Sequence, residues 1–314
     1  MDILCVGQLV TDILVTPVNK VDFDIDTKRV DQISVKNGGD SLNTAIDLAK
    51  LGSKVGFIGK VGDDSFGDFL LKTIKSFDID SRGLKIVKDS STSSVIVLIN
   101  EKGERTFLYY GGTNDTFQYE DIDTSIVKEC RIVHVGGTYL LPEFDGEGAA
   151  RLFRFAQANN IFTSMDVTSD TTGRWLSVIK PCLKYLNLFM PSYKEARAIT
   201  GEKNPEDIAA FLQNEGVGIV VVKLGKDGCY VKSPEKEFYF PAYDVPVIDT
   251  TGAGDSFVAG FLAGMLQNWD LESCARFASA VSAHCIQHLG ATTGIPKFED
   301  VENFINNYHI QNKK

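Results

Sequence analysis

The sequence lacks the features that mark exported, membrane-spanning and nucleic-acid-binding proteins. No apolar run is long enough to cross a bilayer, and the first residues have no basic segment before an apolar one, so we expect neither a membrane span nor a signal peptide. The six cysteines include no Cys-x-x-Cys pair, which is typical of reduced thiols in a cytoplasmic protein. Acidic residues outnumber basic ones by 42 to 32, and the net charge of -10 argues against a nucleic-acid partner.

What the 314 residues do contain is a regular alternation of apolar runs and amphipathic segments. Strand-like runs are Ile3–Gly7, Val55–Ile58, Ile132–Val135, Phe162–Asp166, Leu186–Met190 and Ile219–Leu224. Helix-like segments are Leu42–Leu51, Phe66–Phe77, Gly148–Asn159, Tyr193–Thr200, Pro205–Asn214, Ser256–Gln267, Leu271–His288 and Val301–Asn306. This order predicts an α/β fold of three layers, in which a mostly parallel sheet has helices on both faces.

Two further segments have a different, half-polar pattern. Residues Thr16–Lys36 alternate between polar and apolar, and Ser94–Asn100 and Arg105–Tyr110 form a predicted hairpin around a glycine-containing turn. Such strands suit a sheet with one exposed face, so we predict a small lid made of residues 13–36 and 92–112. No linker or low-complexity tract interrupts the chain, and we expect residues 1–314 to form one domain with this lid.

The most informative motif is Asp249–Phe257, followed by an apolar helix. Its glycines, Gly252 and Gly254, permit a tight turn into that helix, so the free N–H groups around Ala253 predict an anion hole. Asp255 lies beside this hole, where the helix terminus is expected to keep it ionised and able to accept a proton from a hydroxyl. These are the requirements of phosphoryl transfer. The alternative interpretation is a glycine-rich helix start that Asp255 merely caps.

Two other nucleotide-binding motifs are absent. A dinucleotide fingerprint needs glycine where Phe257 stands and belongs near an early strand. The sequence also contains no Gly-x-x-x-x-Gly-Lys-Ser/Thr string, so any ATP site has another architecture.

At these residues the chain resembles the PfkB, or ribokinase-like, carbohydrate kinases. Asp249–Phe257 is similar to the C-terminal signature of that family, and Gly38–Ala45 with Leu51-Gly52 is similar to its N-terminal one. The resemblance extends over nearly the whole chain. It implies a ribokinase-like α/β/α fold and transfer of the γ-phosphoryl group of ATP, with Mg²⁺, to a hydroxyl of a sugar or sugar derivative.

The resemblance also implies roles for residues of the C-terminal signature. Asp255 corresponds to the catalytic base, and the backbone of Gly252, Ala253 and Gly254 to the groups that stabilise the moving phosphoryl. Asp249 and Thr251 correspond to residues that help to hold a monovalent cation such as K⁺.

The N-terminal signature implies a sugar site. Asp12, Gly38, Gly39 and Asn43 match positions that bind sugar hydroxyls, and such residues offer donors, acceptors and close backbone approach. Asp12 has the alternative of a surface turn. Asp40 is either a further hydroxyl acceptor or a cap of the helix that follows it.

Two further segments are similar to elements that contact ATP and metal. Residues 223–228 match a strand-end motif at the ATP phosphates, and we expect Lys223, Gly225 and Gly228 there; the lysine replaces a frequent threonine. Residues 191–195 match a metal and phosphate element, in which Ser192 replaces asparagine and Glu195 is retained to organise Mg²⁺ through water. The roles of Asp166 and Arg174, where the pattern departs from the family, stay open.

Several alternatives remain at the level of the sequence. A nucleoside kinase would use the lid aromatics against a base. A phosphosugar kinase would use the basic lid residues Lys28, Arg29, Lys36 and Arg105, for which we favour a solvated surface. A catalytically silent sugar- or nucleotide-binding regulator is a third. We also expect a homodimer through the lid, because the rows Val95, Val97, Ile99 and Phe107, Tyr109 are apolar.

Overall fold

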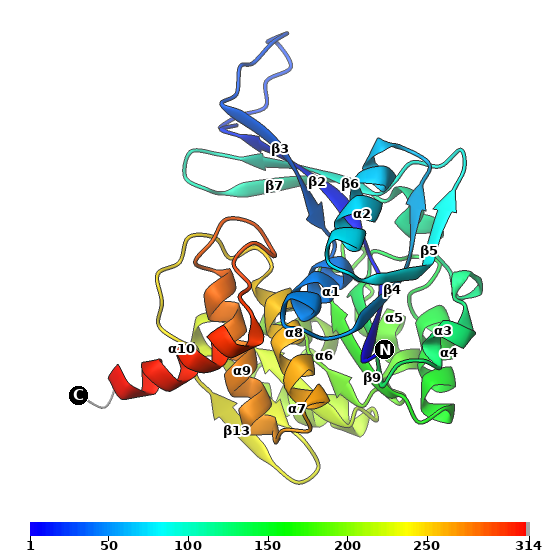
Figure 1. Ribbon diagram of the computed structural model, residues 1–314, viewed down its shortest axis with the longest axis vertical. Coiled ribbons are helices and arrows are strands. Elements are labelled where there is room, and N and C mark those ends of the chain that lie inside the picture. The colour runs from blue at the N-terminus through cyan, green and yellow to red at the C-terminus, as the bar shows by residue number, and fades with distance from the viewer. Residues whose placement is uncertain (312–314) are drawn as a thin grey trace.

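The computed structural model describes residues 1–311, with side chains through Tyr308, and within them the chain forms a nine-stranded and a four-stranded sheet (Figure 1). The large sheet has the order β13-β12-β11-β10-β9-β8-β1-β4-β5. Its strands are β1 (Ile3–Gly7), β4 (Val55–Gly62), β5 (Asp80–Val87), β8 (Ile132–Thr138), β9 (Phe162–Val167), β10 (Leu188–Phe189), β11 (Ile219–Lys223), β12 (Cys229–Lys232) and β13 (Glu237–Phe240). The strands from β11 to β5 are parallel, and β12 and β13 add an antiparallel edge.

Helices cover both faces of this sheet, which confirms the predicted three-layer fold. One face carries α1 (Asp40–Lys50), α2 (Ser65–Ser76), α8 (Ala253–Leu266), α9 (Leu271–Cys285) and α10 (Phe298–Gln311). The other carries α3 (Thr124–Val127), α4 (Glu147–Ala158), α5 (Leu176–Leu183), α6 (Tyr193–Thr200) and α7 (Pro205–Asn214). Strand periodicity explains the division, because in β1 Ile3 and Cys5 pack on the first layer while Leu4 and Val6 pack on the second. Short 3-10 turns are η1 (Gly112–Thr116), η2 (Tyr119–Asp121) and η3 (Gly225–Asp227).

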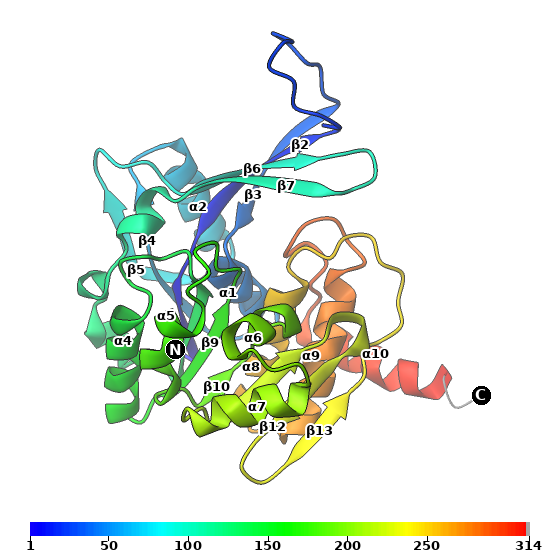
Figure 2. The same cartoon turned by 180° about the vertical axis from the view of Figure 1, so that it is seen from behind.

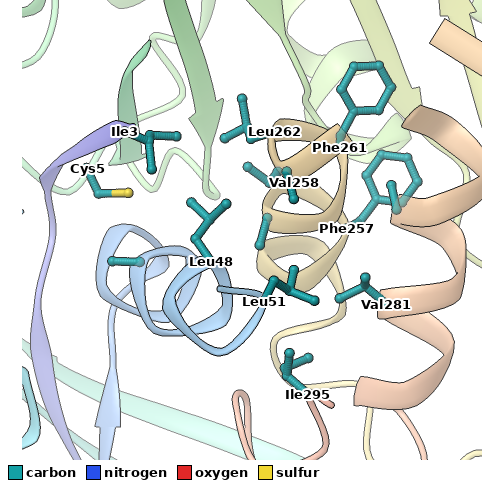
Figure 3. Close-up of a cluster of buried hydrophobic side chains, with 14 of the residues drawn as sticks. Ile3, Cys5, Leu48, Leu51, Phe257, Val258, Phe261, Leu262, Val281 and Ile295 are labelled. Carbon is teal, nitrogen blue, oxygen red and sulfur yellow. The ribbon is translucent and has the colours of Figure 1, made fainter. Parts of the chain in front are cut away.

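The packing of α1, α8 and α9 is shown in Figure 3. Leu48 of α1 lies opposite Val258 and Leu262 of α8, and Val281 contributes from α9. All four side chains are fully buried, and each such burial stabilises the fold by roughly 1.5–3 kcal/mol. Since α8 is enclosed by this core along most of its length, the core fixes the position of its N-terminus.

The small sheet is the lid, with the order β3-β2-β6-β7. Its strands are β2 (Val10–Thr16), β3 (Gln32–Gly38), β6 (Ser94–Ile99) and β7 (Arg105–Tyr110). The hairpin of β6 and β7 is therefore as predicted. The strand pattern assigned to Thr16–Lys36 is wrong for residues 17–31, which form a loop, and the first lid strand instead begins at Val10. Pro17 gives a physical reason for this end, because proline cannot donate to a strand ladder.

The β6–β7 hairpin extends from the lid across the loops that precede α8 and follow α9 (Figures 1 and 2). Its turn is held by Asn100, whose side-chain oxygen accepts hydrogen bonds of 2.9 Å from the N–H groups of Lys102 and Glu104. The lid thus spans from the sheet to the loops beside α8.

The apolar pattern of the sequence does not predict three of the strands. Strands β5, β12 and β13 lie at or next to the edges of the large sheet. Strand β5 exposes four of its eight residues, and β13 is also partly exposed, so they lack a continuous apolar run.

All six cysteines are buried free thiols. Within residues 1–311, no helix combines the length and the apolar character that crossing a bilayer requires.

Candidate active site

A cleft of about 790 Å³ lies between the lid and the carboxyl ends of the parallel strands. Ligands of open α/β sheets bind at this end, because the loops that follow the strands meet there. The predicted site residues that line the cleft are Asp12, Gly39, Asp40, Asn43, Ser192, Glu195, Lys223, Gly225, Gly228, Thr251, Gly252, Ala253, Gly254 and Asp255. The other two predicted residues, Gly38 and Asp249, do not line the cleft but contact Asp12 and Thr251, which do. The structure therefore gathers residues from both ends of the chain around one cavity.

The turn into α8 has the geometry that its glycines predict. Gly252 has a φ of +75°, and a Cβ atom on it would lie 2.3 Å from the carbonyl oxygen of Ala291. Gly252 is also the N-cap and provides no side-chain cap. Asp255 lies in the first turn and does not cap the helix; its Oδ2 accepts a 2.8 Å hydrogen bond from Nδ2 of Asn43. The carboxylate thus faces the cleft rather than the helix end.

Burial is the main influence on the electrostatic environment of Asp255. Burial raises the pKa of Asp255, and the charge of Glu195 acts in the same direction. The hydrogen bond from Asn43 and the charge of Lys223 lower it, but burial prevails. Burial of this carboxylate is a factor that the motif alone does not indicate. A base with a raised pKa takes a proton from a hydroxyl more readily once it is ionised.

The lid contributes Asp12 to the cleft. Asp12 lies within β2 and not in a surface turn, and a Cβ atom on Gly38 of β3 would stand 2.3 Å from its carboxylate oxygens. Glycine at position 38 therefore makes room for this carboxylate. Burial, together with the charge of Asp255, raises the pKa of Asp12 to about 7.

Asp40 is the first residue of α1. The N-cap of that helix is Gly39 and makes no side-chain cap, so the interpretation of Asp40 as a cap is wrong. Burial, the charge of Asp255 and further acidic neighbours raise the pKa of Asp40 well above its ordinary value. Asp40 is thus one more acidic group at the wall of the cleft.

A buried ion pair also lies at the wall of the cleft. Nζ of Lys223, at the end of β11, lies 2.6 Å from Oδ2 of Asp166, at the end of β9, and both side chains are largely buried. A Cβ atom on Gly254 would stand 3.3 Å from this ammonium, so Lys223 lies against the predicted anion hole. Burial raises the pKa of Asp166 to about 7, although Lys223 lowers it in part. Asp166, whose role the sequence left open, belongs to the site.

Ser192 and Glu195 together begin α6. The N–H of Ser192 donates a 2.8 Å hydrogen bond to Oε2 of Glu195, and the N–H of Glu195 donates one of 3.4 Å to Oγ of Ser192. This capping box fixes both side chains at the cleft wall.

Arg105, the first residue of β7, reaches from the lid to the loop before α8. Its guanidinium forms an ion pair with Asp249 and donates a hydrogen bond to Oγ1 of Thr251. The side chain is only 24% exposed, so the preferred interpretation of Arg105 as a solvated lid residue is wrong. Lys28, Arg29 and Lys36 are exposed, as expected.

A carboxylate next to the N–H groups of a helix start, with a lysine beside them, is an arrangement suited to phosphoryl transfer. The comparison with known families agrees, because residues 1–297 match the model described as "pfkB family carbohydrate kinase", and the chain belongs to this family. The resemblance stated from the sequence is thus confirmed.

Individual relatives are consistent with that assignment. An uncharacterized sugar kinase of Archaeoglobus fulgidus is 31% identical over 253 residues, which cover 81% of this chain and 99% of that protein. A 5-dehydro-2-deoxygluconokinase of Clostridium beijerinckii is 28% identical over 322 residues and covers 97% and 93%. A ribokinase-like Escherichia coli protein, solved in complex with ATP and Mg²⁺, has a TM-score of 0.86 at 22% identity over 98% of this chain and 99% of that one. The chain is a carbohydrate kinase, and ATP-dependent phosphorylation of a sugar hydroxyl, the predicted activity, is that of its class.

Proposed function

We propose that the protein transfers the γ-phosphoryl group of ATP to a hydroxyl of a sugar or sugar derivative that itself carries no phosphate. The observation that supports an unphosphorylated substrate is the set of ionisable side chains in the cleft. Among the described residues that line it, Lys223 is the one basic side chain, whereas the acidic ones are Asp12, Asp40, Asp166, Glu195 and Asp255. A substrate phosphate would meet carboxyl groups and no cation on the lid side, so nothing there would compensate its charge.

The basic lid residues support the same choice. Lys28, Arg29 and Lys36 do not line the cleft, and Arg105 is already paired with Asp249. A phosphosugar kinase needs a free cation facing its substrate, so this arrangement favours an unphosphorylated sugar.

On the sugar side, we assign the hydroxyl contacts to Asp12, Asp40, Asn43 and the backbone at Gly38 and Gly39. Carboxylate and amide groups match the donors and acceptors of a polyhydroxy compound. Asp255 accepts the proton of the attacking hydroxyl, and its raised pKa suits that step.

On the nucleotide side, we assign the moving phosphoryl group to the N–H groups of Gly252, Ala253 and Gly254 and to Lys223. These groups are positioned before the reaction, so they stabilise developing negative charge without reorganising. Gly225 and Gly228, in the turn after β11, provide backbone close to the remaining phosphates.

The magnesium ion fits the oxygen donors at this side. The ribokinase-like relative was solved with ATP and Mg²⁺, and Glu195 with the neighbouring Ser192 would hold Mg²⁺ through water. When bound, Mg²⁺ neutralises phosphate charge. In residues 1–311 no group of three His, Cys, Asp or Glu side chains is arranged to hold a metal alone, so the ATP phosphates would supply the other ligands.

The residues expected to hold a monovalent cation, Asp249 and Thr251, fit that ion less well than Glu195 and Ser192 fit Mg²⁺. The side chains of both residues are already engaged by the guanidinium of Arg105. We therefore assign no step to K⁺.

A nucleoside kinase is the second candidate. Phe107 and Tyr109 of β7 line the cleft on the lid side and are 59% and 37% exposed, so a base could stack on them. The same rings also suit the apolar face of a sugar, and the carboxyl group of Asp12 can bind hydroxyls of either substrate.

The proposal also includes one kinase domain, a homodimer through the lid and a cytoplasmic location. The six buried free thiols support a reducing compartment. The support for the dimer is the apolar outer face of the lid, formed by the exposed side chains Ile33, Val35, Ile96 and Leu108.

A phosphorylation screen with ATP and Mg²⁺ tests the function. Ketoses, aldoses, sugar acids, nucleosides and phosphosugars are compared by product formation at equal concentration. We expect phosphate transfer to an unphosphorylated sugar compound. A phosphosugar as the best acceptor would contradict the proposal, a nucleoside would select the second candidate, and no ATP consumption with any acceptor would favour the silent regulator.

A further inference from the structure

The ion pair between the lid and the loop before α8 joins two parts of the chain that the reaction must bring together. Arg105 lies on β7, and its partners Asp249 and Thr251 directly precede the anion-hole turn Gly252–Gly254. Phosphoryl transfer depends on the position of that turn, because its N–H groups must meet the moving group.

Asp249 connects three chain segments. Its Oδ1 accepts hydrogen bonds of 2.8 Å from both the N–H and the hydroxyl of Thr251, and its Oδ2 accepts one of 2.9 Å from the N–H of Gly290. The carboxylate side chain is only 5% exposed.

A buried ionised carboxylate needs a compensating positive charge. The guanidinium of Arg105 supplies it: one nitrogen contacts Oδ1 of Asp249 and another donates to Oγ1 of Thr251. The planar guanidinium presents several N–H donors in a fixed geometry and so restrains both residues at once. A point charge such as an ammonium group lacks this geometry. Thr251 is adjacent to Gly252, so the restraint is transmitted to the first residue of the turn.

We propose, on the basis of the function proposed above, that Arg105 is a positioning residue whose guanidinium holds the anion-hole turn through Asp249 and Thr251, in place of a bound monovalent cation. The same contact orients the lid. Arg105, Phe107 and Tyr109 alternate along β7 and share one face, so docking of the arginine sets both rings over the cleft. Figures 1 and 2 show the β6–β7 hairpin reaching across the loops that carry the partners.

The test compares Arg105→Ala with Lys102→Ala, which removes the same charge from an exposed position of the same hairpin. Turnover, ATP affinity and melting temperature are measured in KCl and in choline chloride at equal ionic strength. We expect the wild-type protein and Lys102→Ala to behave alike in both salts. Arg105→Ala should lose about tenfold or more in turnover in choline chloride, the scale of a lost charged contact.

Chemical rescue separates positioning from a general loss of structure. Added ethylguanidinium, or K⁺, should restore part of the turnover of Arg105→Ala but leave Lys102→Ala unchanged. Arg105→Lys keeps the charge without the second donor prong, so it should retain intermediate turnover and serves as the probe if Arg105→Ala does not fold.

Two results would overturn the proposal: a wild-type protein whose ATP affinity and melting temperature require K⁺, or an Arg105→Ala variant that matches Lys102→Ala in every salt. The ATP affinity and the melting temperature in these comparisons are measured independently of turnover. If the wild-type protein phosphorylates no sugar, the proposed function fails, while ATP affinity and melting temperature still decide the role of Arg105.

Discussion

Nδ2 of Asn43 donates a 2.8 Å hydrogen bond to Oδ2 of Asp255, although the two residues are 212 positions apart in the chain. Asn43 lies in the first turn of α1 and Asp255 in the first turn of α8, and these helices pack together in the core. Oγ1 of Thr44 approaches the carbonyl oxygen of Asp255 at 3.5 Å, a second contact between the same turns. The two signature motifs thus meet at the carboxylate that we assign as the base.

This hydrogen bond predicts a shift in the pH dependence of the reaction. Asn43 donates to the ionised form of Asp255 and so lowers its pKa; Asn43→Ala should therefore raise it. Because the base must be ionised, activity falls as the pH drops through this pKa. The acid limb of kcat/KM should move to higher pH by about one unit, the scale of a hydrogen bond to a charged group.

Asn37→Ala is the matched control for this experiment. Nδ2 of Asn37 donates a 3.1 Å hydrogen bond to Oδ1 of Asn43, whereas among the described side chains Asn43 is the residue that donates to the carboxylate of Asp255. The acid limb of Asn37→Ala should therefore stay near that of the wild-type protein. An unchanged limb in Asn43→Ala would show that Asp255 does not govern the pH profile.

Replacing the base itself should separate chemistry from binding. Asp255→Asn keeps the size of the side chain but cannot accept the hydroxyl proton, so turnover should fall by about two orders of magnitude or more. ATP affinity, measured by calorimetry, should stay close to the wild-type value. Turnover near that of the wild-type protein would remove Asp255 from the mechanism.

The parts of the fold and site that follow from the sequence are those that repeat a local rule. The central strands have continuous apolar runs, and the glycines before α8 allow a tight turn, so both could be predicted. The ion pairs could not. Lys223 and Asp166 are 57 positions apart and Arg105 and Asp249 are 144 apart, and nothing local to either pair indicates its partner. The raised pKa of Asp255 could not be predicted for the same reason, because segments distant in the chain bury this carboxylate.

The buried pair of Lys223 and Asp166 should show strong coupling. Lys223→Met leaves the carboxylate of Asp166 buried without its partner and should lower the free energy of unfolding by about 3 kcal/mol. Adding Asp166→Asn should recover much of this stability, because the unpaired charge is gone. ATP affinity should stay weak in the double variant, since Lys223 lies against the anion hole. Denaturation by urea and ATP titration of the two single variants and the double variant complete the cycle.

Additive losses of stability would mean that the two side chains do not interact as a buried pair. Recovery of ATP affinity in the double variant would contradict the assignment of Lys223 to the phosphates, and would leave the pair with a purely structural role.

The lid surface predicts how two chains associate. The rows that the sequence suggested for a dimer are partly used within one chain, because Val95 and Val97 are only 8% and 4% exposed. The opposite face has a cross-strand row instead, in which Val35 pairs with Ile13, Ile13 with Ile96, and Ile96 with Leu108.

The side chains of this cross-strand row are exposed to solvent, which favours the outer face of the lid as the dimer contact. Val35, Ile96 and Leu108 are 43%, 40% and 53% exposed, an apolar surface that soluble proteins normally cover. Ile96→Asp places a charge in its centre and should convert a dimer into a monomer in sedimentation at tens of micromolar. Ile86→Asp, a matched change at a 55% exposed residue of β5, should remain dimeric. A wild-type monomer at that concentration, with and without sugar, would contradict the dimer and leave the lid as a cover for its own cleft alone.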